Sequence, residues 1–186
     1  PETLQVLKAV GLTSITVGIE TPDEGTLRQY KRAPINDDKQ REFVARCREM
    51  DIRTVAGFMI GFPDDTTADI RGVLKYAKVV NPTYANFNIV TPYPGTEFFA
   101  EVKNEIADFD FSKYTVCTPA MTYKSLTREE VLQLHAKCFT SYYFRWPYLK
   151  DNAKLLWPAL RKFSLKSEAA VPPSSDKSHA TPKRPH

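Results

Sequence analysis

Two kinds of residue at the ends of short apolar runs could contact a ligand. Glu20 directly follows the run 15–19, and its carboxylate could accept hydrogen bonds from ribose hydroxyls or from a ligand ammonium group. Gly57 and Gly61 lie in one apolar run, where glycine weakens a strand unless another group must come close to its backbone. A flat ring such as adenine is one such group. Both segments are therefore candidates for ligand binding.

Each of these candidates also has a purely structural interpretation. Glu20 could cap a helix or form an ion pair with Lys31 or Arg32. The two glycines could instead let a helix pack tightly against the strand. The residue types alone leave these alternatives open.

A third apolar run, 84–91, adds two amides and a rigid turn. Asn86 and Asn88 share one face of the predicted strand, because side chains two residues apart in a strand point the same way. In a sheet covered on both faces these amides need partners, which a ligand or a core hydrogen-bond network would supply. The turn that follows, Pro-Tyr-Pro-Gly-Thr at 92–96, places Tyr93 beside the end of the strand.

Strands must position these residues, and the chain alternates strand-like and helix-like stretches. The patterns predict strands at 15–19, 54–60 and 84–91 and helices at 3–10, at 37–50 and after the turn at 63–66. Connections of more than a dozen residues between strands are typical of parallel β/α units, whose working residues lie at the carboxyl ends of the strands. Three strands cannot close a barrel. We therefore expect an α/β fold with an open sheet or one half of a barrel.

The later part of the chain has a helical pattern. Thr127 and Glu130 have the spacing of a capping box, which predicts a helix from there to about Phe144. We expect Pro147 to break this helix and a second helix to follow at 148–160.

The composition is that of a globular protein. Of 186 residues, 42% are hydrophobic, and the net charge of +4 is too diffuse to indicate nucleic-acid binding. No run of about 18 apolar residues could span a membrane, and no signal peptide opens the sequence. Cys47, Cys117 and Cys138 are too widely spaced for a CxxC metal site, and we expect reduced thiols as in the cytosol.

Several segments in this order resemble a known family. The runs VGIET, VAGFMIGFPDDT and NFNIVTPYPGTEFF are similar to the second half of the radical S-adenosylmethionine (SAM) barrel. The branch they resemble carries an N-terminal cobalamin-binding domain and includes the anaerobic Mg-protoporphyrin monomethyl ester cyclases and the hopanoid-modifying enzymes. The segment CFTSYYFRWPYL resembles the helical C-terminal region of that branch. The likeness covers about residues 1–160.

The resemblance implies an α/β fold with three parts. Residues 1–100 would be the C-terminal half of a partial (β/α) TIM-like barrel, 101–165 a helical C-terminal region, and 166–186 a disordered tail. Because the sequence begins at Pro1 and has no CxxxCxxC loop, we expect the C-terminal fragment of a longer enzyme, inactive by itself.

The resemblance also implies a reaction. A 4Fe-4S cluster would cleave SAM, and the resulting radical would abstract hydrogen from an unactivated carbon of a lipid-like or tetrapyrrole-like substrate. Flavodoxin or ferredoxin would donate the electron, and a preceding domain would bind cobalamin. The protein would be cytoplasmic, with peripheral contact at the inner membrane face as an option, and no nucleic-acid partner is expected.

Carried over residue by residue, the resemblance assigns a cofactor site. Glu20 would contact the ribose or amino group of SAM, and Lys31 or Arg32 would pair with its carboxylate. The adenine pocket would comprise Gly57, Ile60, Gly61, Asn88, Val90, Pro92 and Tyr93.

Two other functions remain as alternatives. One is a tRNA-modifying radical SAM enzyme of the methylthiotransferase type, although those enzymes usually end in a small basic β-domain. The other is a non-catalytic interaction module that keeps the geometry for a SAM-like ligand.

The aromatic residues of 139–163 also allow two interpretations. They could form a membrane interface or the mouth of a pocket for a large apolar substrate, or they could pack the C-terminal helices against the barrel.

Overall fold

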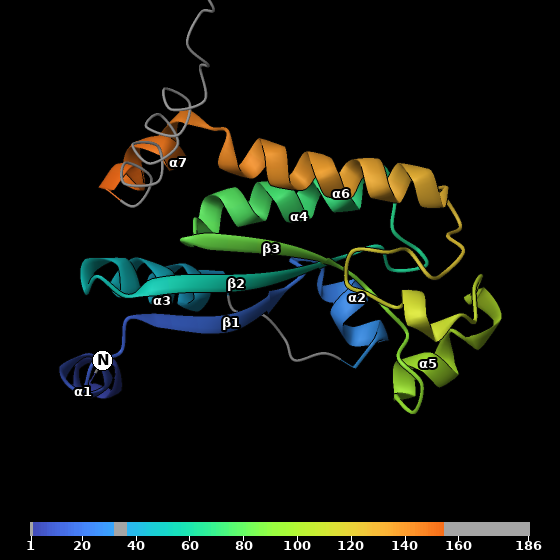
Figure 1. The fold of residues 1–186 in the computed structure, drawn as a ribbon, viewed down its shortest axis with the longest axis horizontal. Helices are drawn as coiled ribbons and strands as arrows, with labels where there is room; N and C mark the ends of the chain where they lie inside the picture. Colours follow the sequence, from blue (N-terminus) through green and yellow to red (C-terminus); the bar gives the residue numbers. More distant parts are fainter. Residues whose placement is uncertain (1, 32–36, 155–186) are drawn as a thin grey trace, which may run out of the picture. The chain divides into compact units, whose positions relative to one another are not determined.

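The structure is a computed structural model that describes residues 2–31 and 37–154 (Figure 1). Its helices and strands are α1 (Glu2–Ala9), β1 (Ser14–Glu20), α2 (Glu24–Gln29), α3 (Asp37–Glu49), β2 (Arg53–Ile60), α4 (Thr67–Val80), β3 (Tyr84–Ile89), α5 (Glu97–Glu101), α6 (Arg128–Tyr143) and α7 (Trp146–Asp151). Two short 3₁₀ turns, Lys103–Glu105 and Phe111–Lys113, lie between α5 and α6.

The three strands form one parallel sheet in the order β1-β2-β3. Gly18 of β1 is paired in register with Gly57 of β2, and Gly57 is paired with Asn86 of β3. The α/β class and the parallel order predicted from the sequence are confirmed. The arrangement is that of part of a TIM-like barrel.

Helices cover one face of this sheet, which we call the helix face. On β2 the residues Ala56, Phe58 and Ile60 are fully buried, whereas Gly57 and Met59, which point the other way, are half-buried. Helices α3 and α4 pack on β2 and on each other, and α6 packs on β3 and on α4, as Figure 1 shows. We call the opposite face, which carries Gly57 and Met59, the cavity face.

Local signals set the ends of several helices as predicted. Gly11 has φ +101° just after α1, a conformation that glycine adopts without steric cost. Thr127 and Glu130 form the predicted capping box at the start of α6. The Thr127 hydroxyl accepts from the Glu130 N–H at 3.1 Å, and the Glu130 carboxylate accepts from the Thr127 N–H at 2.7 Å.

The predicted end of α6 at about Phe144 is confirmed, but the role predicted for Pro147 needs a correction. The helix stops at Tyr143, with Phe144 as its C-cap, and Pro147 lies in the first turn of α7 rather than at the break. Proline suits that position because the first helical N–H groups have no partner within the helix. The predicted second helix thus begins at Trp146, and its continuation to residue 160 lies outside the described residues, as does the predicted tail 166–186.

Aromatic residues of α6 and α7 hold the beginning of β3. The Tyr143 hydroxyl donates to the Ala85 carbonyl at 3.1 Å and accepts from the Ala85 N–H at 3.0 Å. The hydroxyls of Tyr142 and Tyr148 donate to the carbonyls of Pro82 and Thr83. For these rings the packing interpretation therefore holds.

Two neighbouring rings do not pack in this way. Phe144 and Trp146 are 82% and 77% exposed. Trp157 and Phe163 lie outside the described residues. No helix in the described ranges is both long and apolar enough to cross a bilayer. Contact with a membrane surface stays a prediction.

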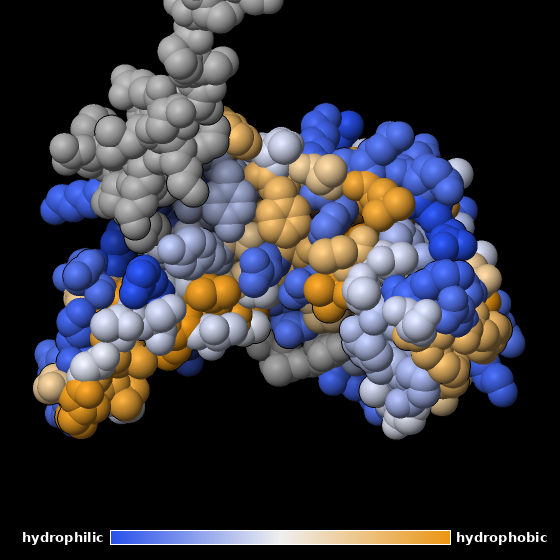
Figure 2. Space-filling view, in the orientation of Figure 1, coloured by the Kyte–Doolittle hydropathy of each residue, from blue (hydrophilic) through white to orange (hydrophobic). Residues whose placement is uncertain are grey.

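The residues up to Tyr148 form one compact unit by their internal contacts, and Leu149 begins a second unit. Apolar surface is exposed on α1 and directly after it, where Val6 and Val10 are 63% and 78% exposed (Figure 2). The domain boundaries expected at 100/101 and 165/166 stay predictions.

Candidate active site

A cavity of about 370 Å³ lies on the cavity face of the sheet. It is lined by residues of all three strands and of the turns beyond β3: Thr16, Val17, Gly18, Glu20, Gly57, Met59, Asn86, Asn88, Ile89, Thr91, Tyr93 and Val116. Four of the predicted site residues, Glu20, Gly57, Asn88 and Tyr93, are therefore brought together around one space. Whether they bind a cofactor stays a prediction.

Two paired glycines form the floor of this cavity. A Cβ placed on Gly57 would lie 3.5 Å from the Asn88 Nδ2 atom, which is an ordinary contact. The protein atoms around Gly57 would thus accommodate a larger residue. Its side chain would extend into the cavity. Helix packing does not explain this glycine, since it points away from the helix face. A bare backbone floor suits a flat ring.

Gly61 differs from Gly57 in this respect. Its φ is +77°, and a Cβ there would lie 3.3 Å from Ile89 Cγ2 and 3.4 Å from Val131 Cγ1. Val131 belongs to α6, so tight packing of a helix against the sheet accounts for Gly61. Helix packing thus accounts for Gly61, and close approach of a ligand to Gly57 stays a prediction.

Glu20 is aimed into the cavity by a bulge at the end of β1. The register shifts between Gly18 and Glu20, and Glu20 has φ +66°, a left-handed conformation that is costly for a residue with a Cβ. A Cβ on Gly18 would lie 3.0 Å from Glu20 Oε1. The carboxylate therefore lies directly above Gly18, which the sequence analysis did not single out.

Asn86 and Asn88 both lie on the cavity face. Asn86 is exposed and Asn88 is half-buried, and both line the cavity. Two kinds of partner were considered for these amides, a core hydrogen-bond network and a ligand. Their position at the cavity leaves room for a ligand.

A buried carboxylate shapes the turn after β2. Asp65 is 8% exposed, and its Oδ2 accepts from the N–H groups of Gly61 at 2.7 Å and Phe62 at 3.1 Å. Burial raises the pKa of the Asp65 carboxyl to about 6, although the two N–H groups favour its charged form. Asp65 thus fixes the left-handed turn at Gly61, a function that a turn pattern in the sequence does not reveal.

The other predicted site residues lie elsewhere. Ile60 is fully buried on the helix face, Val90 is buried with Phe62, Val102 and Met121, and Pro92 is buried. None of these three lines the cavity.

Lys31 lies apart from the cavity, on the surface. Its ammonium group pairs with Glu97 and Glu101, and the hydrogen bonds that it donates to these two carboxylates raise the pKa of Lys31. It lines a separate shallow pocket with Tyr30 and Phe98. Arg32 lies outside the described residues.

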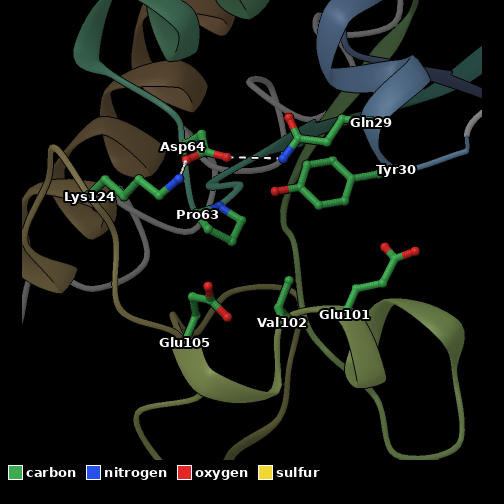
Figure 3. A pocket seen from close by; sticks show the side chains of 8 residues that line it. All are labelled: Gln29, Tyr30, Pro63, Asp64, Glu101, Val102, Glu105 and Lys124. Atoms are coloured by element: carbon green, nitrogen blue, oxygen red, sulfur yellow. Dashed lines mark hydrogen bonds and ion pairs between the residues drawn. The ribbon is translucent and has the colours of Figure 1, made fainter.

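A second cavity of about 270 Å³ lies beside the turn after β2 (Figure 3). The Asp64 carboxylate there accepts from Gln29 Nε2 at 3.0 Å and pairs with Lys124. These partners, Lys124 first, hold the pKa of Asp64 below its usual value. Tyr30 stacks on Phe62 with ring centroids 4.9 Å apart. These contacts connect α2, the turn after β2 and the segment before α6. The residues around the second cavity therefore stabilise this turn.

The chain's own residues do not fit an iron–sulfur cluster. Cys47 and Cys138 are buried, Cys117 is exposed, and no three Cys, His, Asp or Glu side chains converge on a metal position within residues 2–31 and 37–154. The residues of the first cavity do fit a ligand with hydroxyl, ammonium and planar groups, because a carboxylate, two amides and a bare backbone floor surround one space.

Comparison with known proteins gives the same family. Residues 1–77 match the radical SAM superfamily. An uncharacterized methyltransferase of Pyrococcus horikoshii is 30% identical over 143 residues, 76% of this chain and 31% of that protein. An anaerobic magnesium-protoporphyrin IX monomethyl ester cyclase of Cereibacter sphaeroides is 33% identical over 132 residues, 70% of this chain and 21% of the cyclase. A bacteriochlorophyllide d C-8(2)-methyltransferase of Chlorobaculum tepidum is 28% identical over 117 residues, 61% of this chain and 26% of that enzyme.

The chain thus spans 21% to 31% of the length of these relatives. The resemblance to the group that contains the anaerobic cyclases is confirmed, and the family implies a 4Fe-4S cluster and SAM as cofactors. The chain belongs to the radical SAM superfamily.

Proposed function

We propose that this chain forms part of the SAM site of a radical SAM enzyme that acts on a large, flat, apolar substrate of the tetrapyrrole type. The observation that carries the proposal is the cavity in which Glu20, Gly57 and Asn88 meet at the carboxyl ends of parallel strands. The names of two relatives, a magnesium-protoporphyrin cyclase and a bacteriochlorophyllide methyltransferase, support the substrate class.

In this proposal the residues of the chain bind and orient SAM. The Glu20 carboxylate accepts hydrogen bonds from the ribose hydroxyls or the ammonium group, and the amides of Asn86 and Asn88 complete the polar contacts. The adenine ring lies over the floor made by Gly18 and Gly57. SAM supplies the group that abstracts hydrogen from an unactivated carbon.

Further cofactors and partners of the proposal lie outside this chain. The cluster ligands are provided by another part of the enzyme, since the three cysteines here do not converge. We propose further that another domain binds cobalamin and that flavodoxin or ferredoxin donates the electron. The enzyme would work in the cytoplasm or at the cytoplasmic face of the membrane.

The test is made in the complete, cluster-loaded protein that contains this chain. Glu20→Ala removes a charge-assisted hydrogen bond, so the Kd for SAM should rise about tenfold or more. Formation of 5′-deoxyadenosine should fall with it. Glu24→Ala is the matched control, because Glu24 is an exposed carboxylate that pairs only with Arg28 among the ion pairs of the described residues.

Three outcomes separate the alternatives. Equal SAM affinity in Glu20→Ala and the unaltered protein would remove Glu20 from the site. SAM binding without any 5′-deoxyadenosine would favour the non-catalytic module. Activity on a tRNA and none on a porphyrin would favour the tRNA-modifying enzyme.

A further inference from the structure

Five aromatic rings between β3 and α6 contact one another in a continuous cluster. We call it the aromatic rim: Tyr93, Phe99, Phe109, Phe111 and Tyr114. Tyr93 contacts Tyr114 with centroids 6.5 Å apart, and Tyr114 contacts Phe111 at 5.1 Å. Phe111 in turn contacts Phe99 at 6.3 Å and Phe109 at 6.5 Å. All four pairs are edge-to-face, an arrangement that aromatic rings favour.

Three of the five rings of the rim are exposed to solvent. Tyr93, Phe109 and Phe111 are 43%, 55% and 48% exposed. Only Tyr114 is buried, and its hydroxyl donates to the Asp108 carbonyl at 2.7 Å. Figure 2 shows the resulting apolar surface over α5 and the segment after it. Packing within the described residues therefore does not account for these rings, and exposed contiguous apolar surface usually marks a binding site.

The rim is continuous with the cavity of the proposed SAM site. Tyr93 lines the cavity and belongs to the rim, and Val116, 43% exposed, lines the same wall. The segment is fixed to the end of β3, because Ile89 N–H donates to the Val116 carbonyl at 2.7 Å and Thr91 Oγ1 donates to the Thr115 carbonyl at 3.0 Å. The exposed rings are thus held at the mouth of the cavity.

From this placement we infer that the aromatic rim binds the flat conjugated ring of the substrate while the reacting edge of that substrate lies at the cavity mouth. The inference rests on the proposed function and adds the surface that selects the substrate. A cavity of about 370 Å³ matches a ligand of nucleoside size, so a tetrapyrrole ring must lie outside it. Among the described lining residues, Tyr93 is the aromatic one, and the rim extends from its side.

The charges beside the rim favour ring contacts over carboxylate recognition. Lys113, which lies between Phe111 and Tyr114 in the sequence, is paired with Asp108 at 3.1 Å and with Asp110 at 3.2 Å. Its charge is therefore already compensated. Rigid rings also suit a rigid flat partner better than a flexible acyl chain, because fewer rotamers are lost when two rigid groups pack.

The experiment uses the complete protein, with protoporphyrin IX as the fluorescent probe and SAM titrated separately. Phe111→Ala should raise the Kd for protoporphyrin IX about tenfold, the size expected for loss of one ring contact and its apolar area. Phe109→Ala should act in the same direction. The Kd for SAM should stay within about twofold, since neither ring lines the cavity. Phe144→Ala, which removes an exposed phenylalanine ring outside the rim, is the control and should change neither Kd.

The outcomes separate this inference from the proposed function. If Phe111→Ala binds the porphyrin as the unaltered protein does, the inference is wrong and the proposed function stands. If SAM binds and protoporphyrin IX does not, the inference is wrong, and of the proposed function only the SAM site stands. Oleate binding that Phe111→Ala abolishes, with no porphyrin binding, would also overturn it. Porphyrin binding that depends on the rim, in a protein that does not bind SAM, would support the rim and refute the proposed function. The melting temperature of the variants should fall by no more than a few degrees, because about half of each removed ring is exposed.

Discussion

The two faces of β2 differ although their residues alternate along one strand. On the helix face, Ala56, Phe58 and Ile60 are fully buried, and Phe58 contacts Phe87 of β3 with centroids 5.6 Å apart. On the cavity face, Gly57 leaves its backbone bare and Met59 is half-buried. One face is filled by the protein itself. The other has the space and polar groups for a ligand.

This difference shows where stability and binding are located in the sheet. Large side chains on the helix face stabilise the fold because they bury apolar area. Gly18 and Gly57 on the cavity face have no side chain and bury little. Substitutions on the two faces should therefore have separable effects. The predictions below test that separation.

The largest expected effect is on the helix face. Phe58→Ala removes a fully buried ring and should lower the free energy of unfolding by about 3–5 kcal/mol. Met59→Ala, one residue further and on the cavity face, should cost less than half as much because Met59 is already partly exposed. Urea denaturation of the two variants measures the difference. Equal losses would mean that the cavity face contributes as much to stability as the helix face.

A smaller effect is expected from Asp65 and depends on pH. The pKa of about 6 in the folded protein lies above the usual 3.8, so folded Asp65 keeps a proton that the unfolded chain has released. This proton binding stabilises the folded protein, and the stabilisation is fully present below about pH 4. It is lost as the pH rises through about 6, and because the pKa of Asp65 is raised by about two, the free energy of unfolding should fall by up to about 3 kcal/mol.

Asp65→Asn keeps an acceptor for the N–H groups of Gly61 and Phe62 but cannot ionise. Relative to this variant, the unaltered protein should become less stable from pH 4 to pH 7 in urea titrations. Asp64→Asn is the contrasting control. The pKa of Asp64 is lowered by Lys124 and Gln29, so its contribution is present at neutral pH and is lost as the pH falls. If the contributions of Asp65 and Asp64 to the free energy of unfolding changed in the same direction with pH, the burial of Asp65 would be contradicted.

The sheet could be predicted from the sequence because its signals are local. The apolar runs gave the three strands and their parallel order, and the carboxyl ends of those strands gave Glu20 and Asn88. The period of two also explains why Ile60 does not line the cavity. Ile60 is three residues from Gly57 and therefore lies on the opposite face, while Met59, two residues away, lines the cavity.

The rest of the site depends on contacts between distant segments. The bulge that aims Glu20 over Gly18 has only a weak local sequence signal, the glycine two residues before the glutamate. The position of Lys31 follows from α2, a six-residue helix that begins after the N-cap Asp23 and has no apolar period to reveal it. The aromatic rim is built from irregular chain, where periodicity gives no prediction.

The smallest expected effect on stability separates the two glycines of β2 and its turn. Gly61→Ala places a Cβ in a left-handed conformation and within 3.3 Å of Ile89, so it should destabilise the fold by about 1–2 kcal/mol. Gly57→Ala adds a Cβ at an ordinary contact distance and should change stability by less than about 1 kcal/mol. Its Cβ instead enters the cavity, so the Kd for SAM should rise about tenfold in the complete protein. Thermal melts and SAM titration of both variants measure the two quantities. If Gly57→Ala bound SAM normally and lost stability instead, Gly57 would serve packing, as Gly61 does, and the ligand would have to lie elsewhere on the cavity face.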